Sequence, residues 1–142
     1  MLAELFKVFS SDSTITNIVG NRVFPHHLPQ SNLTLPVLTY QLISNTHDYT
    51  LENAYGVARA RVQVDCWGDT LATVESLAEA VRQTIQGAHG MMGSTYVHFI
   101  QLDDEQDMHE LIEDSDKWLY RRTQDYLIKY CESVPTWEFD GT

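Results

Sequence analysis

The stretch that decides the fold runs from residue 57 to residue 85 and reads VARARVQVDCWGDTLATVESLAEAVRQTI. Its first half alternates small apolar side chains with polar ones, which is the period of a β-strand with one buried face. The face predicted to be buried holds Ala58, Ala60, Val62, Val64 and Cys66. The opposite face holds Arg59, Arg61, Gln63, Asp65 and Trp67. The second half repeats apolar residues at helical spacing after a capping residue, Asp69 or Thr70. We therefore expect a strand followed directly by a helix that packs across its smooth face.

The segment before this unit predicts helices followed by one strand. Residues 2–9 carry one apolar stripe at helical spacing, and a second short helix is predicted through residues 15–19. Three prolines in residues 25–36 predict an irregular crossing loop. Residues 37–44 alternate as a strand, and the polar residues 45–56 are predicted to form a loop.

The segment after the helix predicts more strands. Gly90 to Gly93 are interpreted as a loop, residues 95–102 as a third strand and residues 118–131 as a long final strand. Met108 and its apolar neighbours indicate a further strand edge. The fold class predicted is α+β: a single domain over residues 1–131, with an antiparallel or mixed β-sheet of about 4–5 strands and helices packed on one face. Residues 132–142 are predicted to be a C-terminal tail that serves as an interaction segment.

Composition and charge exclude several classes of function. The 142 residues include 20 Asp and Glu against 9 Lys and Arg, a net charge of −11. A groove that grips nucleic acid needs clustered cations, and so does attachment to an anionic membrane, so neither is expected. No apolar stretch is long enough for a membrane span, and residues 1–9 do not resemble a signal peptide. We expect a soluble protein made in the cytoplasm, with free thiols at Cys66 and Cys131.

Part of the negative charge is concentrated in one segment. Residues 103–116 contain no Lys or Arg and eight acids: Asp103, Asp104, Glu105, Asp107, Glu110, Glu113, Asp114 and Asp116. They lack the spacing of a calcium-binding loop. We interpret the segment as a solvated acidic loop or the lining of a pore.

Residues with catalytic or metal-binding chemistry do not form a recognisable site. His26 and His27 are adjacent in a proline-flanked loop, where a metal would need a further ligand from elsewhere. Cys66 lies on the face predicted to be buried and is interpreted as a core residue. We therefore predict no enzyme, no catalytic residue, no metal and no cofactor. A metal-binding enzyme using His26, His27 and the acidic segment is kept as a remote alternative.

The unusual side chains are those expected at interfaces. The candidates for a subunit or partner contact are Arg59, Arg61, Trp67, Met91, Met92, Trp137 and Phe139. Aromatic side chains, Met and Arg are enriched in such contacts. The alternative is a sheet face that the chain covers with its own tail.

The order of four sequence blocks resembles the tail-completion (tail-terminator) family of long-tailed bacteriophages and gene-transfer particles. The blocks are NRVFPHHLPQ at residues 21–30, LPVLTYQ at 35–41, ARVQVDCWG at 60–68 with the helix that follows, and LYRRTQDY at 119–126. The resemblance covers residues 1 to 131. It implies a structural protein of the virion tail and neck, assembled in the host cytoplasm, without a catalytic residue.

The resemblance also implies partners. Members form a homo-oligomeric ring, commonly a hexamer, which caps the head-proximal end of the tail tube and joins it to the head connector. The partners expected are therefore the tail tube protein and the head–tail connector or stopper protein, with DNA only passing through the lumen and no membrane. Another neck or minor tail structural protein is the alternative. A ring of identical subunits uses two different complementary faces, and Arg59 and Arg61 with the acidic segment are candidates for such a pair. The same acids could instead form the wall past which DNA slides.

Overall fold

The computed structural model describes residues 1–29, 33–51, 53–112 and 116–134. Its elements in chain order are α1 (Leu2–Ser11), α2 (Ser13–Val19), β1 (Val23–Pro25), β2 (Val37–Tyr49), β3 (Ala54–Gly68), α3 (Leu71–Ile85), β4 (Gly90–Met92), β5 (Thr95–Leu111) and β6 (Trp118–Cys131).

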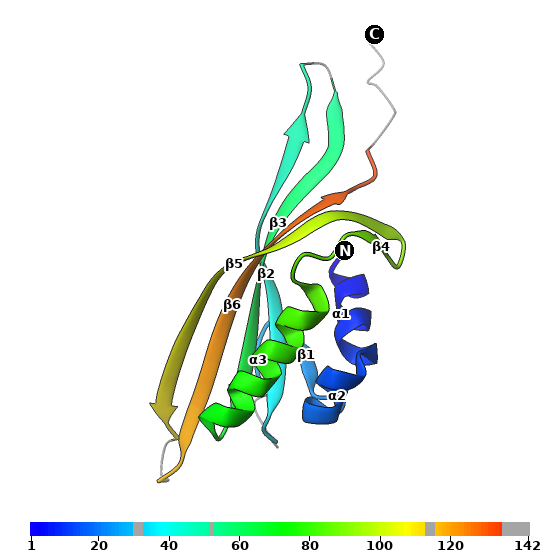
Figure 1. The fold of residues 1–142 in the computed structure, drawn as a ribbon. Helices are drawn as coiled ribbons and strands as arrows, with labels where there is room; N and C mark the ends of the chain where they lie inside the picture. The colour runs from blue at the N-terminus through cyan, green and yellow to red at the C-terminus, as the bar shows by residue number, and fades with distance from the viewer. Residues whose placement is uncertain (30–32, 52, 113–115, 135–142) are drawn as a thin grey trace.

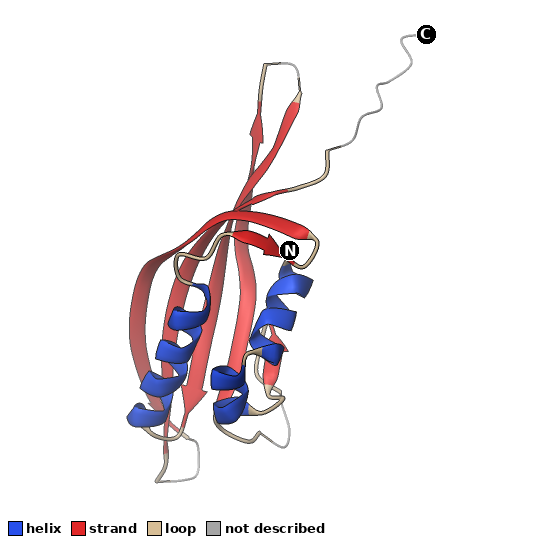
Figure 2. Cartoon of the chain, turned by 45° about the vertical axis from the view of Figure 1, so that its right-hand side comes forward, coloured by secondary structure: helices blue, strands red, loops and turns tan. Residues whose placement is uncertain are grey.

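One curled sheet of six strands carries all three helices on the same side (Figure 1). The strand order is β1-β2-β3-β6-β5-β4, and every pair is antiparallel except β1 with β2. Figure 2 shows α3 beside the α1–α2 pair, with the sheet behind them. The α+β class, the mixed sheet and the one-sided helices are confirmed. The predicted strand number of 4–5 is too low, because β1 and β4 have three residues each and are too short to show a period.

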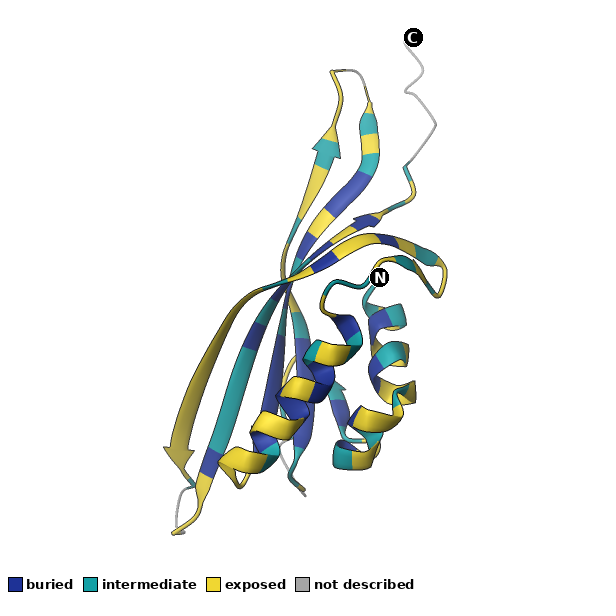
Figure 3. Cartoon of the chain, viewed as in Figure 1, coloured by how far each residue is buried: buried dark blue, intermediate teal, exposed yellow. Residues whose placement is uncertain are grey.

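The core lies between the helices and the sheet, as the burial colours show in Figure 3. The five residues of the smooth β3 face are all fully buried, as predicted. The helix α3 crosses them with a buried stripe of Val74, Leu77, Ala78, Ala80, Val81 and Ile85. At its start, the Thr70 hydroxyl accepts the backbone N–H of Thr73 at 3.2 Å, which satisfies one of the free amides of the first turn. The small side chains of β3 therefore allow α3 to lie close to the sheet.

Three predicted loops are wrong in the same way. Residues 45–56 lie mostly in β2 and β3, which continue beyond the core as a long hairpin. Residues 103–111 continue β5, so the strand edge predicted around Met108 is confirmed, while the loop predicted for the acidic residues before it is wrong. Residues 90–92 form β4. In each case polar or small residues pair in the sheet because backbone hydrogen bonds with a long neighbouring strand outweigh their weak strand propensity.

The hairpin formed by β2 and β3 beyond the core extends away from the helices at the end of the sheet (Figure 1). Its exposed apolar side chains include Ile43, Tyr49, Leu51 and Tyr55. No helix in the described part of the chain is both long and apolar enough to cross a bilayer.

Candidate assembly surfaces

The face of the sheet opposite the helices carries a charged network around Asp65. Its carboxylate accepts two hydrogen bonds from the Arg121 guanidinium, each 3.1 Å long. It also accepts the Thr123 hydroxyl at 2.6 Å and the Gln63 amide at 3.0 Å. Asp65 is only 3% exposed although it points away from the helices of the described residues. The neighbouring strand β6 supplies Thr123 and Arg121, because cross-strand register places Thr123 opposite Asp65 and Arg121 two residues away, and Gln63 comes from β3 itself.

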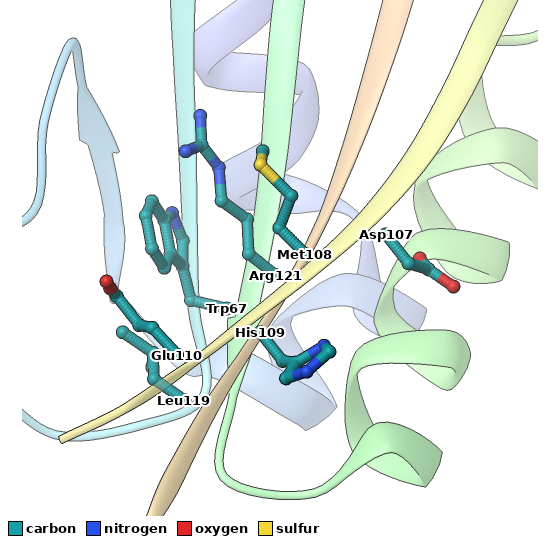
Figure 4. A pocket seen from close by; sticks show the side chains of 7 residues that line it. All are labelled: Trp67, Asp107, Met108, His109, Glu110, Leu119 and Arg121. Atoms are coloured by element: carbon teal, nitrogen blue, oxygen red, sulfur yellow. The ribbon is translucent and has the colours of Figure 1, made fainter.

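Trp67 extends this network toward the end of the sheet. The Arg121 guanidinium lies 4.7 Å from the centre of the indole ring, a cation–π contact, and the indole N–H donates to the Thr39 hydroxyl at 2.9 Å. Beside it is a pocket of about 410 Å³, shown in Figure 4, that is lined by Trp67, Asp107, Met108, His109, Glu110, Leu119 and Arg121. Trp67 is thus held in place by its own chain while one side of it borders a pocket.

Arg59 and Arg61 lie on the same face as Trp67, and both have partners within the chain. Arg59 donates to Asp48 at 2.7 Å, and Arg61 donates to Asp103 at 3.1 Å. The pairing of Arg61 with the acidic segment therefore occurs inside one subunit. Arg59 nevertheless has 59% of its side chain exposed, and exposed ion pairs of this kind contribute little to stability. Neither arginine is withdrawn from solvent.

The acids of β5 divide between the two faces of the strand. Asp104 points to the uncovered face, and Asp107 points to the helix side, opposite Arg122. Arg122 donates two hydrogen bonds to Asp107, at 2.6 and 3.0 Å, and these hold the pKa of that carboxyl below its usual value. Asp103 and Asp104 lie at the bulge that follows Leu102. Glu105 accepts a hydrogen bond of 3.3 Å from the side-chain amide of the buried Gln124. The predicted acidic surface is therefore spread along one edge of the sheet.

Asp104 and Asp125 are directly opposite each other on β5 and β6. Burial raises the pKa of Asp125; Arg61 acts against that rise, while Asp104 and Asp103 add to it. Like charges directly across a strand pair destabilise it. The structure therefore keeps a local excess of negative charge on the uncovered face.

Of the other predicted interface and acidic residues, Met91 and Met92 lie on β4, apart from this face, whereas Glu110 lines the pocket beside Trp67. Met91 in β4 is 66% exposed, and Met92 is partly buried against the core. Glu110 is exposed near the end of β5, and Asp116 is exposed in the turn that follows. Glu113, Asp114, Trp137 and Phe139 lie outside the described residues. The sequence predictions missed the exposed apolar tip of the hairpin, because those residues were assigned to a polar loop.

Residues with metal-binding or nucleophilic chemistry are scattered. No group of three His, Cys, Asp or Glu side chains that could hold a metal ion is found among the described residues. His26 and His27 are exposed in the crossing loop. Cys66 is fully buried, as predicted, and its burial raises the pKa of the thiol, which keeps it protonated and a poor nucleophile. Cys131 is exposed.

Comparison with known proteins assigns this fold. The family model described as "Tail completion protein gp17" matches residues 3–130. A solved chain from the "Virion of native gene transfer agent (GTA) particle" superposes with a TM-score of 0.68 and 16% sequence identity, covering 92% of this chain and 94% of that chain. At that identity the likeness concerns the fold alone. None of the curated proteins matches. Because the family match spans nearly the whole described sheet with its helices, the chain belongs to the tail completion protein gp17 family and is a structural component of the virion tail.

Proposed function

We propose that the chain forms a ring that caps the head-proximal end of the tail tube. The ring is hexameric, ends elongation of the tube and joins the tail to the head connector, with DNA passing through its lumen. The observation that carries this proposal is the tail-completion family match over residues 3–130. We expect no catalytic activity.

The distribution of surfaces on the monomer supports a ring. Helices occupy one face of the sheet, while the other face has the Asp65 network and exposed charges. A ring needs two different complementary surfaces on each subunit. The exposed Arg59 on β3, the strand next to β2, and the acids of β5 toward the other side of the sheet offer opposite charges for such contacts.

The charge of the chain supports a role as a conduit. With a net charge of −11, the protein repels the DNA backbone more than it holds it. Salt screens this repulsion over about 8–10 Å, so only acids near the lumen wall act on the DNA. Asp104 and Asp125 on the uncovered face are candidates for that wall. Passing DNA would then meet no cationic groove in which it could be trapped.

The test is to mix the purified protein with purified tail tubes and to image both by negative-stain electron microscopy. We expect rings at one end of each tube and no further growth when free tube protein is added. Tubes that stay uncapped and continue to grow would refute the proposal. Density for this chain elsewhere in the particle would point to another neck or minor tail protein.

A further inference from the structure

The two outer long strands of the sheet each have an unpaired stretch of backbone. The short strand β1 pairs only with Leu38 to Tyr40 of β2, and β4 pairs only with Thr95 to Val97 of β5. Within the described residues, no other strand pairs with the outer side of β2 or β5. We call residues 41–49 the β2 free edge and residues 101–111 the β5 free edge.

The direction of the outward backbone groups on β5 follows from hydrogen bonds at its covered end. The backbone N–H of Ile100 donates to Ala88 at 3.1 Å, and its C=O accepts from Gly87 at 2.7 Å, so both groups point away from β6. Outward and inward groups alternate along an antiparallel strand, and one bulge follows Leu102. The outward amides farther along therefore belong to Glu105, Asp107 and His109.

The same argument applies to β2. The C=O of Tyr40 accepts from the N–H of His26 at 2.8 Å, so the backbone groups of Tyr40 point outward, away from β3. One bulge follows Leu42. The outward amides beyond the bulge belong to Asn45 and His47. On both free edges the side chains of these outward residues point to the helix side, so the two edges have matching pleats.

Strand direction makes the two edges compatible in a ring. All neighbours in β2-β3-β6-β5 are antiparallel, so β2 and β5 run in opposite directions. Rotation about a ring axis leaves strand direction along that axis unchanged. The β5 free edge of one subunit therefore meets the β2 free edge of the next in an antiparallel sense.

The free edges lie at opposite ends of the sheet, since β1 covers the start of β2 and β4 covers the start of β5 (Figure 1). Joining them requires a shift along the strands at every junction. Sheets that close into barrels need this kind of stagger, together with strand tilt. The shift is therefore compatible with closure.

We propose that the β5 free edge pairs antiparallel with the β2 free edge of a second copy, so that one sheet continues from subunit to subunit. This inference rests on the proposed ring and names its contact. Exposed long edge strands otherwise favour aggregation. Charge complements the pairing: Asp104 of one copy, on the face away from the helices, approaches Arg59 on β3 of the next, which lies on the same face one strand spacing of about 4.8 Å behind the joint.

Disulfide crosslinking tests the pairing and its register. Thr46 is exposed on β2, and its backbone amide points toward β3 of its own sheet. The backbone amides of Asp104, Gln106 and Met108 on β5 likewise point toward β6 of their own sheet. Such residues face each other across an antiparallel joint at about 4.5 Å between Cα atoms, which a disulfide can bridge. In a Cys131→Ser background, Thr46→Cys is combined with Asp104→Cys, Gln106→Cys or Met108→Cys. The matched control combines Thr46→Cys with Ser76→Cys, an exposed position on α3.

We expect one of the three pairs to give a ladder of crosslinked species on a non-reducing gel, in the presence of purified tail tubes, and the control to give none. A backbone test accompanies it: His109→Pro removes an outward amide and should reduce assembly at least tenfold, whereas His109→Ala should not. Capped tubes without any crosslink would overturn the edge pairing but leave the proposed function intact. Uncapped tubes with every variant and with the wild type would overturn both.

Discussion

Asp65 and Arg121 form an ion pair with two hydrogen bonds on the side of the sheet opposite α1, α2 and α3. The carboxylate is shielded by the strands and side chains around it, and Arg121 in turn stacks on Trp67. A buried charge of this kind is costly to leave without its partner. The pair therefore fixes the relative position of β3 and β6 near the candidate assembly surface.

Asp65→Ala should lower the free energy of unfolding by about 3 kcal/mol, because three donors including a guanidinium lose their acceptor. Urea denaturation followed by circular dichroism measures the loss. Asp48→Ala is the matched control, since its partner Arg59 is exposed and the pair should contribute less than about 1 kcal/mol. Equal losses in the two variants would contradict the buried role of Asp65.

Arg61→Glu should weaken subunit association by about tenfold, and it should change monomer stability little because Arg61 and Asp103 are 35% and 37% exposed. Sedimentation velocity over a concentration series measures association. Asp103→Asn removes the same intramolecular pair without reversing a charge. If Arg61→Glu assembles like the wild type, Arg61 makes no contact that matters for subunit association.

Tyr126→Phe should cost about 1–2 kcal/mol of stability. The Tyr126 hydroxyl donates to the Gln124 side chain at 3.0 Å, and both residues are fully buried, so the amide oxygen would lose its donor. Thermal or urea unfolding measures the change. Tyr130→Phe provides the comparison: its hydroxyl contacts Asn45 in a partly buried site, and a smaller loss is expected.

Asp125→Asn should stabilise the protein at neutral pH by roughly 0.5 kcal/mol, since a like charge lies directly opposite at Asp104. The sign follows from the raised pKa of Asp125. The folded state favours the protonated acid, so the contribution of Asp125 to stability is greatest below the ordinary pKa of 3.8 and declines as the pH rises through the folded value.

The stability difference between Asp125→Asn and the wild type should therefore shrink as the pH is lowered toward 3. Chemical denaturation at several pH values measures it. A variant less stable than the wild type at pH 7 would show that hydrogen bonds to the Asp125 carboxylate outweigh its repulsion.

The sequence by itself was sufficient for the central unit and for the sidedness of the sheet. The two-residue period of β3 and the helical spacing of α3 are local patterns, and they predicted both elements, the burial of Cys66 and the position of Arg61 on the opposite face of β3. The order of its sequence blocks also indicated the family that the comparison found. Local periodicity is informative wherever one face of an element is buried.

Only the tertiary structure decided what lies beyond the core. Residues 45–49 of β2 and the acidic half of β5 have no apolar period, because neither segment has a buried face. Their strand form depends on pairing with β3 and β6, which are distant in sequence. The same long-range register brought Arg121 to Asp65, and Asp103 to Arg61. Sequence spacing carries no information on such contacts, since they arise when strands far apart in the chain become neighbours in the sheet.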